Sequence, residues 1–358
     1  MVNCTPTIVF VLSDKNHFLF NHYSAFLHPN IQTMDNILII GAAGQIGSEL
    51  TVALRNIYGA EHVFATDIKH PSQDIMEGGP FQLLDVMDDK RLIHFVIRHK
   101  ITQIYHLAAV LSGNAERIPI QAWNINMDSL MNILDLAKEV PEIRKVFWPS
   151  SIAVFGPTTP RDNTPQFTVM EPNTVYGISK LAGERWMQYY HRRYHIDARS
   201  IRYPGLISYK TEPGGGTTDY AVEIFSDAIH RGHYECFLSE DTALPMMFMP
   251  DAVQSTIRLM EADASSIEVR SSYNLGGISF TPKQLAAEII KYIPDFRITY
   301  KPDFRQAIAD SWPRSIDDTV ASRQWGASCT YSLDDMTRIM IDEVGKKIET
   351  KKIITATE

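Results

Sequence analysis

The feature that most constrains the fold is an apolar run that ends in a glycine-rich turn. Ile37 to Ile40 form the run, which is typical of a strand buried on both faces of a parallel sheet. Helical spacing of apolar residues then extends from Ile46 to Ile57. Glycines at this spacing permit a tight turn, close approach of a pyrophosphate and close packing of helix on strand. The sequence therefore predicts a dinucleotide site on the helix N-terminus, with contacts from Gly41, Gly44, Gln45, Ile46 and Gly47.

An acid at the end of the second predicted strand indicates which dinucleotide binds. Asp67 lies 20 residues past Gly47, where a carboxylate meets the adenosine ribose hydroxyls. The same carboxylate repels the 2′-phosphate of NADP, so NAD is favoured, although an acid in a turn with no ligand is the alternative. Further predicted cofactor contacts follow the third and fourth strands, near the adenine and where the cofactor passes over backbone: Asp85, Val86, Leu107, Ala108 and Ala109.

Strands and helices alternate along most of the chain, which predicts an α/β fold with a Rossmann-type doubly wound parallel sheet. The later strands are expected at 62–66, 81–84, 103–107, 145–148 and 198–202, and the helices at 91–99, 122–138 and 174–194. Past residue 203 the pattern loosens, with helices expected at 220–231, 252–260 and 282–292. We therefore expect an N-terminal extension (1–35), an NAD-binding domain (36–209), a smaller C-terminal substrate lobe interleaved with the sheet (210–335), and a C-terminal helix and tail (336–358).

Composition excludes several classes of protein. The formal net charge of −8 argues against nucleic acid as a main partner. The three cysteines show no paired spacing, which indicates neither a disulfide framework nor a zinc site. No apolar run approaches the roughly 20 residues of a membrane span. Residues 1–35 are poor in acids, as in a mitochondrial presequence, but they contain no arginine; a disordered leader, or a start at Met34, is the alternative.

A tyrosine and a lysine four residues apart form the candidate catalytic pair. Tyr176 and Lys180 lie on one predicted helix, where residues i and i+4 share a face. An ammonium group near a phenol favours the phenolate and lowers its pKa, so the pair can accept a proton from an alcohol as hydride leaves its carbon. Ser151, after the fifth strand, can orient the substrate oxygen. A solvated helix face is the alternative for this common spacing.

These elements together resemble the extended short-chain dehydrogenase/reductase family. The resemblance rests on Gly41 to Gly47, Leu107-Ala-Ala, Ser151 and Tyr176-Gly-Ile-Ser-Lys180, and it covers residues 36 to about 335. It implies that Ser151, Tyr176 and Lys180 are catalytic and that the lysine also holds the nicotinamide ribose. It further implies a structural or relay role for Asn124 and a place beside the nicotinamide for Tyr203 and Pro204.

Three stretches are similar to the branch of that family that acts on L-threonine: 149–157, 213–225 and 310–318. This implies oxidation of the β-hydroxyl of L-threonine by NAD+ to 2-amino-3-oxobutanoate. The expected substrate contacts are Thr217 and Thr218, which with neighbouring backbone N–H groups would hold the carboxylate, and Ser112, which would contact the amine or hydroxyl. Trp312 would cover the site, or would simply pack in the lobe.

The resemblance also implies a homodimer through a four-helix bundle of the two long helices, and work in mitochondria. Two other functions stay open. A nucleotide-sugar epimerase or dehydratase would grip a diphosphate with arginines, for which Arg305, Arg314 and Arg323 are candidates. A cofactor-sensing module without turnover would be expected to lack the tyrosine or lysine. His191 and His195 have a zinc-compatible spacing but no third ligand nearby, so we expect no metal.

Overall fold

The computed structural model describes residues 35–211 and 214–357, with side chains up to residue 350. The predictions made for the N-terminal extension therefore lie outside the described residues. By its internal contacts the chain divides into two units, Met1–Met34 and Asp35–Glu358. Within the described part, no helix combines the length and apolar character needed to cross a membrane.

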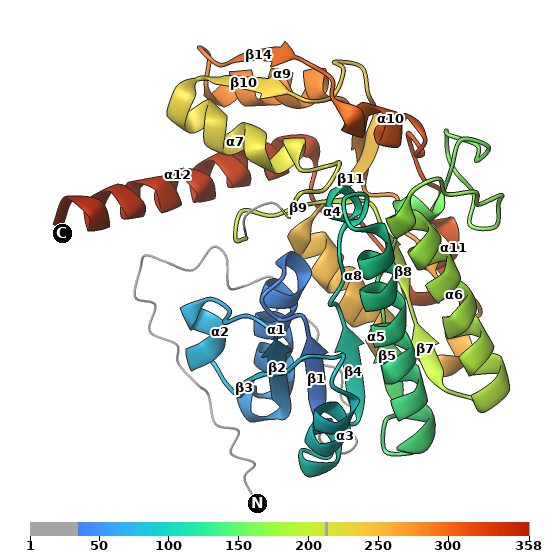
Figure 1. Cartoon of the computed structure of the whole chain (residues 1–358). Helices are drawn as coiled ribbons and strands as arrows, with labels where there is room; N and C mark the ends of the chain where they lie inside the picture. Colours follow the sequence, from blue (N-terminus) through green and yellow to red (C-terminus); the bar gives the residue numbers. More distant parts are fainter. Residues whose placement is uncertain (1–34, 212–213, 358) are drawn as a thin grey trace, which may run out of the picture. The chain divides into compact units, whose positions relative to one another are not determined.

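A six-stranded parallel sheet forms the centre of the fold, which confirms the predicted fold class (Figure 1). Its strand order is β3-β2-β1-β4-β5-β7. The first strand, β1, pairs in parallel with β2 and with β4, and its first residue, Ile37, lies opposite Val63 of β2 and Gln103 of β4. The strands are β1 (Ile37–Ile40), β2 (Val63–Asp67), β3 (Phe81–Leu83), β4 (Gln103–His106), β5 (Lys145–Phe147) and β7 (Asp197–Arg199).

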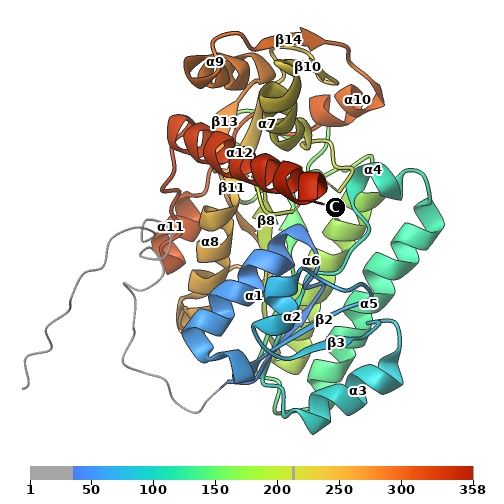
Figure 2. The ribbon, with the colours of Figure 1, turned by 90° about the vertical axis from the view of Figure 1, so that its left-hand side faces the viewer.

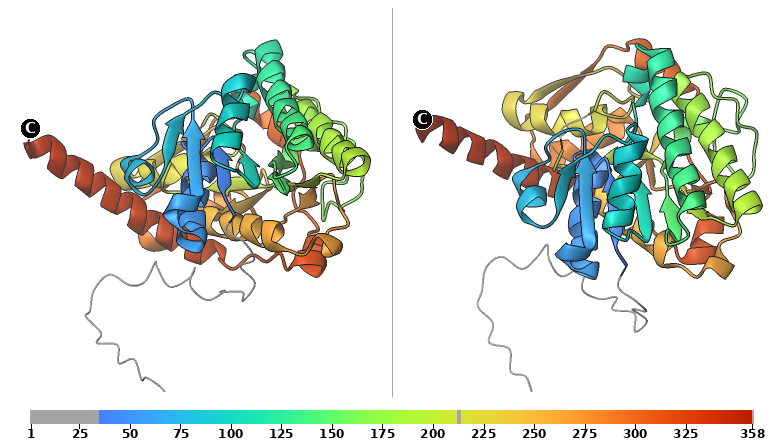
Figure 3. Two further views of the ribbon diagram at one scale, coloured as in Figure 1. Left: turned by 90° about the horizontal axis from the view of Figure 1, so that it is seen from below. Right: turned by 60° about the horizontal axis from the view of Figure 1, so that its bottom comes forward.

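Helices cover both faces of this sheet. Figures 2 and 3 show α5 (Pro119–Glu139) and α6 (Val175–Tyr194) on one face, with α1 (Gln45–Tyr58) and α8 (Met249–Glu261) on the other. A cluster of buried apolar side chains lies between the sheet and its α5–α6 face, as expected from the continuous apolar runs of the strands. Shorter helices complete the layers: α2 (Gln73–Glu77), α3 (Asp89–Arg98) and α4 (Ser112–Ala115).

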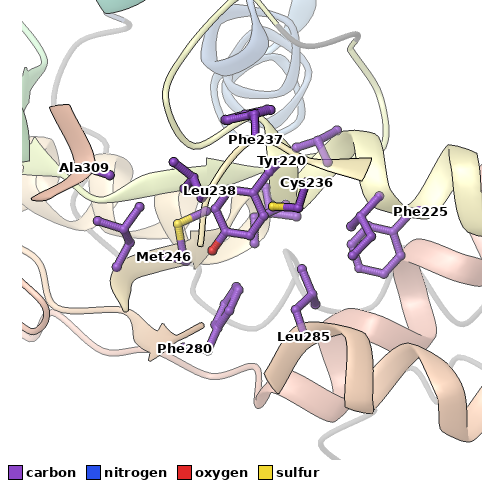
Figure 4. Packing of buried hydrophobic residues seen from close by; sticks show 14 of the residues in the cluster. Tyr220, Phe225, Cys236, Phe237, Leu238, Met246, Phe280, Leu285 and Ala309 are labelled. Atoms are coloured by element: carbon purple, nitrogen blue, oxygen red, sulfur yellow. The ribbon is translucent and has the colours of Figure 1, made fainter. Parts of the chain in front are cut away.

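The second lobe is built from short strands and helices beyond residue 203. Strands β9 (Gly205–Ile207), β11 (Leu244–Phe248) and β13 (Ile278–Phe280) form one small sheet, and β10 (His233–Cys236) pairs with β14 (Arg297–Tyr300). Figure 4 shows the lobe core, where Cys236 lies buried among aromatic and aliphatic side chains. The helices of the lobe are α7 (Tyr220–Arg231), α9 (Pro282–Tyr292), α10 (Phe304–Asp310), α11 (Thr319–Trp325) and α12 (Leu333–Thr357).

The predicted strands at 145–148 and 198–202 both end early, where the chain leaves the central sheet. The strand expected at 145–148 ends at Phe147, and a separate strand β6 (Ser150–Ser151) follows Pro149. The strand expected at 198–202 breaks at Ser200 into β7 and β8 (Ile201–Tyr203). β6 and β8 join β12 (Tyr273–Asn274) in a small sheet of their own. This change of sheet brings Ser151 and Tyr203 towards the second lobe.

Candidate active site

A cleft of about 660 Å³ opens at the carboxyl ends of the parallel strands, where ligands of such sheets bind. The structure brings almost all of the predicted site residues into its lining. Asn124 is the exception. The predicted residues that line the cleft are Gly41, Gly44, Gln45, Ile46, Gly47, Asp67, Asp85, Val86, Leu107, Ala108, Ala109, Ser112, Ser151, Tyr176, Lys180, Tyr203, Pro204, Thr217, Thr218 and Trp312.

The turn between β1 and α1 leaves no room for side chains at two of its glycines. Gly41 has a φ of +90°, and a Cβ there would lie 2.7 Å from the backbone nitrogen of Ala108. A Cβ on Gly47 would lie 2.1 Å from the carbonyl oxygen of Gly41. No side chain caps the first turn of α1, so its N–H groups stay available to an anion. The buried side-chain nitrogen of Gln45, Nε2, also has no partner among the described residues. The turn therefore offers free N–H donors, as a site for a pyrophosphate requires.

Asp67 is held at the adenosine end of the cleft by its own backbone neighbours. One carboxylate oxygen accepts from the backbone nitrogen of Ala43 at 2.9 Å, and the other accepts from that of Lys69 at 3.0 Å. The acid is therefore fixed against the glycine turn, as expected for a group that meets ribose hydroxyls. Farther along, Asp85 accepts from the backbone nitrogen of Met87 at 2.9 Å.

The candidate catalytic hydroxyls come from β6 and the first turn of α6. Tyr176 and Ser151 both line the cleft, and the Ser151 hydroxyl acts to lower the pKa of Tyr176. The Thr174 hydroxyl accepts from the backbone nitrogen of Gly177 at 3.1 Å, which caps the helix and fixes the position of the tyrosine. One turn farther along, the Lys180 Nζ donates to the carbonyl oxygen of Pro149 at 2.6 Å and lies 4.2 Å from the centre of the Trp148 ring.

Burial reverses the pKa shift that the sequence predicts for the tyrosine. Desolvation raises the pKa of Tyr176 to about 12, and the hydrogen bond from Ser151 offsets only part of this. Burial also lowers the pKa of Lys180 to about 7, although the carboxylate of Glu184 opposes that shift. The prediction of a lowered tyrosine pKa is therefore wrong for this structure, because the lysine is itself desolvated and its Nζ lies 5.4 Å from the centre of the Tyr176 ring.

The prediction for Asn124 is wrong, and the neighbouring Asn126 has the expected environment. Asn124 is exposed on α5, whereas Asn126 is only 3 % exposed. The Asn126 side chain accepts from the backbone nitrogen of Val110 at 2.7 Å and donates to the carbonyl oxygen of Val110 at 3.1 Å and to the Ser179 hydroxyl at 3.4 Å. Helical spacing could have identified it, since Ala122, Asn126 and Ser129 share the buried face.

The loop before α7 forms the substrate end of the cleft, and Asp219 in it was missed by the sequence analysis. Asp219 accepts from the backbone nitrogens of Gly215 and Gly216, both at 2.7 Å. The sequence predicts that backbone N–H groups of this loop hold a substrate carboxylate. In the structure the N–H groups of Gly215 and Gly216 are already bound to Asp219. The Thr217 hydroxyl, by contrast, is buried without a partner among the described residues. An acid at the start of a helix was the available signal for Asp219.

Other predicted residues have mixed roles. Trp312 is buried in the lobe core and also lines the cleft. It therefore packs in the lobe, which was one prediction, and contacts the site, which was the other. Arg305 and Arg314 pair with Asp303 and Asp162, and neither these arginines nor Arg323 line the cleft. The described residues contain no group of three or more potential metal ligands.

Known proteins of the same architecture identify the family. The NAD dependent epimerase/dehydratase family matches residues 37–276, and the chain belongs to it. The chain is 47 % identical over 316 residues to an uncharacterized epimerase/dehydratase of Staphylococcus aureus (strain MRSA252), covering 88 % of this chain and 98 % of the relative.

Two solved structures that resemble the chain are described as threonine dehydrogenases. A partial consensus L-threonine 3-dehydrogenase is 56 % identical, with a TM-score of 0.84, over 86 % of this chain and 99 % of that one. The GalE-like L-threonine dehydrogenase from Cupriavidus necator, in its holo form, is 54 % identical, also with a TM-score of 0.84 and the same coverage. The chain is thus an NAD-dependent oxidoreductase of this family, and its cofactor is NAD.

Proposed function

We propose that the chain oxidises the β-hydroxyl of L-threonine with NAD+ to L-2-amino-3-oxobutanoate and NADH. The observation that carries the proposal is the composition of the cleft, in which the Ser151–Tyr176 pair and the loop of Thr217 and Asp219 line one space beside the dinucleotide turn. Oxidation of a secondary alcohol needs a hydroxyl pair such as Ser151 and Tyr176. The loop of Thr217 and Asp219 offers polar groups that suit a small zwitterion. The similar structures described as threonine dehydrogenases support the same substrate.

In the proposed reaction the β-hydroxyl loses its proton to the Tyr176 phenolate, while the hydrogen on Cβ leaves as hydride and the C–O bond becomes a carbonyl. Ser151 donates to the substrate oxygen and orients it. When bound, NAD+ accepts the hydride and brings a cationic ring to the cleft. Because burial raises the pKa of Tyr176 to about 12, the phenolate needs positive charge nearby, which Lys180 supplies in its ammonium form.

For substrate binding, we propose that the free hydroxyl of Thr217 and the neighbouring Thr218 hold the carboxylate. Asp219 is a buried carboxylate at the edge of the cleft and matches the ammonium group of an amino acid. Ser112, on α4, lines the facing wall and is placed to contact the amine or the hydroxyl. These roles predict a preference for α-amino-β-hydroxy acids over simple alcohols.

A second candidate is another reaction of the family, such as a nucleotide-sugar epimerase or dehydratase reaction. The family name and the curated relative from Staphylococcus aureus favour it. The ion-paired Arg305 and Arg314 count against it, because the three arginines named for diphosphate binding do not line the cleft.

The deciding experiment follows NADH formation by absorbance, with NAD+ and L-threonine, L-serine, D-threonine, L-allo-threonine or UDP-glucose. We expect turnover of L-threonine and its loss by roughly 10²–10⁴-fold in Tyr176→Phe, since that variant removes the proton acceptor. A Tyr189→Phe variant, on the same helix outside the cleft, is the matched control. Turnover of UDP-glucose without any amino acid would replace the proposal by the second candidate.

We also propose a homodimer through α5 and α6. The two helices lie side by side (Figure 1) and carry exposed large apolar side chains: Ile120, Trp123, Ile178, Trp186 and Tyr189. A surface of this kind is expected to be covered by a second copy. Light scattering at micromolar concentration should give twice the chain mass, and Trp186→Glu should halve it; a wild-type monomer contradicts the dimer.

For the N-terminal extension we keep the proposal of mitochondrial targeting, which rests on its low acid content. Fusing residues 1–35 to a fluorescent protein tests it in a eukaryotic cell. Diffuse cytoplasmic fluorescence would favour the alternative of a simple leader.

A further inference from the structure

A fully buried ion pair lies one helical turn behind the catalytic lysine. Glu184 and Arg202 have side-chain exposures of 0 % and 1 %. The arginine Nε and Nη2 donate to the two carboxylate oxygens at 2.8 Å each, which is the bidentate arrangement. Burying two charges is costly, and an apolar pair of similar volume is often as stable, so fold stability alone does not account for the pair.

The pair is joined to the active site through adjacent serines of β6. The Ser150 hydroxyl donates to Glu184 at 2.7 Å, whereas the next residue, Ser151, lines the cleft with Tyr176. Ser150 also lies opposite Arg202 in the pairing of β6 with β8. The strand that positions the catalytic hydroxyl therefore also fixes the carboxylate.

Glu184 is held in one position from the second lobe as well. Arg202 Nη1 donates to the carbonyl oxygen of Gln166 and to the Asn274 side chain, both at 3.0 Å. Asn274 in turn donates to the carbonyl oxygens of Thr164 and Asp317, both at 3.2 Å. These bonds occupy the guanidinium group, so neither partner can turn towards solvent.

Lys180 needs a nearby anion because its other close neighbours are uncharged. It is only 2 % exposed, and its Nζ contacts the Pro149 carbonyl and the ring of Trp148. Glu184 is four residues farther along α6 and so on the same face, and its charge raises the pKa of the lysine against the effect of burial.

Two other titratable groups flank the lysine. These are Tyr176 on α6 and His106 on β4. The buried His106 keeps a pKa of about 3, partly because of the lysine itself, and is neutral at neutral pH. Behind Glu184 stand Arg202 on β8 and, at 3.7 Å, Arg185 on the exposed side of α6. Glu184 is thus the anion that the structure places to act on Lys180.

We propose that Glu184, clamped by Arg202 and Ser150, is a positioning residue that keeps Lys180 in its ammonium form at the floor of the cleft. Tyr176 needs the positive charge of this ammonium group in order to act as a base. In this respect the inference rests on the proposed function. Glu184 acts through the lysine and does not line the cleft.

The test is the titration of Lys180 itself in the full chain saturated with NAD+. Lysine labelled with ¹³C at Cε reports each ammonium group by NMR, and Lys180→Met identifies the resonance. In Glu184→Gln, which keeps the shape and removes the charge, we expect the Lys180 titration to move down by about one pH unit or more. Glu139→Gln, an exposed carboxylate on α5, is the matched control and should leave it unchanged.

Turnover of L-threonine gives the second readout. In Glu184→Gln we expect kcat near neutral pH to fall about fivefold for a one-unit drop of the lysine titration and about tenfold for each further unit, with KM within about twofold of the wild-type value. Arg202→Lys keeps a cationic partner for Glu184 and should retain the wild-type titration.

Should Glu184→Gln fail to fold because Arg202 is left unpaired, the double variant Glu184→Gln/Arg202→Gln removes both charges, and we expect the same downward shift. An unmoved Lys180 resonance in a folded variant that lacks Glu184 overturns the inference. Absence of threonine turnover in the wild-type chain would refute the proposed function only, because the NMR titration does not depend on the substrate.

Discussion

The carboxylate of Asp219 lies 2.7 Å from the backbone nitrogen of Gly216, a contact that closes the substrate loop on itself. Burial raises the pKa of this acid, and the two glycine N–H groups oppose that shift. The loop therefore holds its shape through an internal anion. This arrangement leaves the Thr217 hydroxyl, with no partner among the described residues, as a donor for a substrate.

Asp219→Asn is expected to raise the KM for L-threonine about tenfold or more, because an uncharged amide weakens both the loop and the contact with the substrate ammonium. Steady-state kinetics checks this. Thr217→Val, which keeps the volume and removes the hydroxyl, should also raise KM. Unchanged KM values in both variants would show that this loop does not bind the substrate.

The rate of threonine oxidation should rise with pH up to about pH 7 and level off above it, because burial lowers the pKa of Lys180 to about 7 and its ammonium charge is lost as the phenolate fraction grows. The active form is the Tyr176 phenolate, and burial raises the pKa of that phenol to about 12, so each added pH unit increases the phenolate fraction up to about tenfold. A profile of kcat/KM against pH measures this. A rate that does not rise with pH below neutral would contradict tyrosine as the base.

His106 should make the fold less stable in acid. Burial, and then the Lys180 charge, lower its pKa to about 3 from 6.5, so below pH 6.5 the unfolded chain binds a proton that the folded chain does not. The contribution of neutral, buried His106 to the free energy of unfolding is therefore fully present above pH 6.5. It is lost as pH falls below that value, by about 1.4 kcal/mol per pH unit. Urea unfolding at about pH 7 and pH 5 should show a loss of about 2 kcal/mol that is absent in His106→Gln.

Asp67 should set both the affinity and the choice of cofactor. In Asp67→Asn we expect the Kd for NAD+ to rise by roughly tenfold or more, since hydrogen bonds to a charged group contribute about 1.5–3 kcal/mol. Binding of NADP+ should improve relative to NAD+, because the repelling charge is gone. Fluorescence titration with both cofactors provides the measurement, and an exposed carboxylate variant, Asp89→Asn, is the control.

The ion pair of Glu184 and Arg202 gives a prediction for stability that is independent of its proposed role. Arg202→Met should lower the free energy of unfolding by about 3–5 kcal/mol, because a buried carboxylate loses its partner. Replacing both members, as Glu184→Gln/Arg202→Met, should cost less than the single change. Denaturant unfolding of both variants measures the difference; a double variant that loses more stability than Arg202→Met alone would contradict this prediction.

Features that depend on residues close together in the chain can be predicted from the sequence. The glycine turn, Asp67 at a fixed distance past it, and Tyr176 with Lys180 on one helix all belong here, because strand and helix periodicity set their spacing. The same periodicity predicts the strands of the central sheet and its long helices. The limits of this reasoning are visible at Trp148 and Ser200, where the predicted strands end early and the chain continues in a second small sheet.

Features that depend on burial and on distant segments are settled by the tertiary structure. Helical spacing places Asn126 on the buried face of α5, but only the packing of α5 against the Val110 loop shows which backbone groups it bonds. The raised pKa of Tyr176 depends on how far the folded chain buries it. The Glu184–Arg202 pair joins α6 to β8 across 18 residues of chain. Desolvation is a property of the whole packed environment of a group, so it has no signature in the local order of residues.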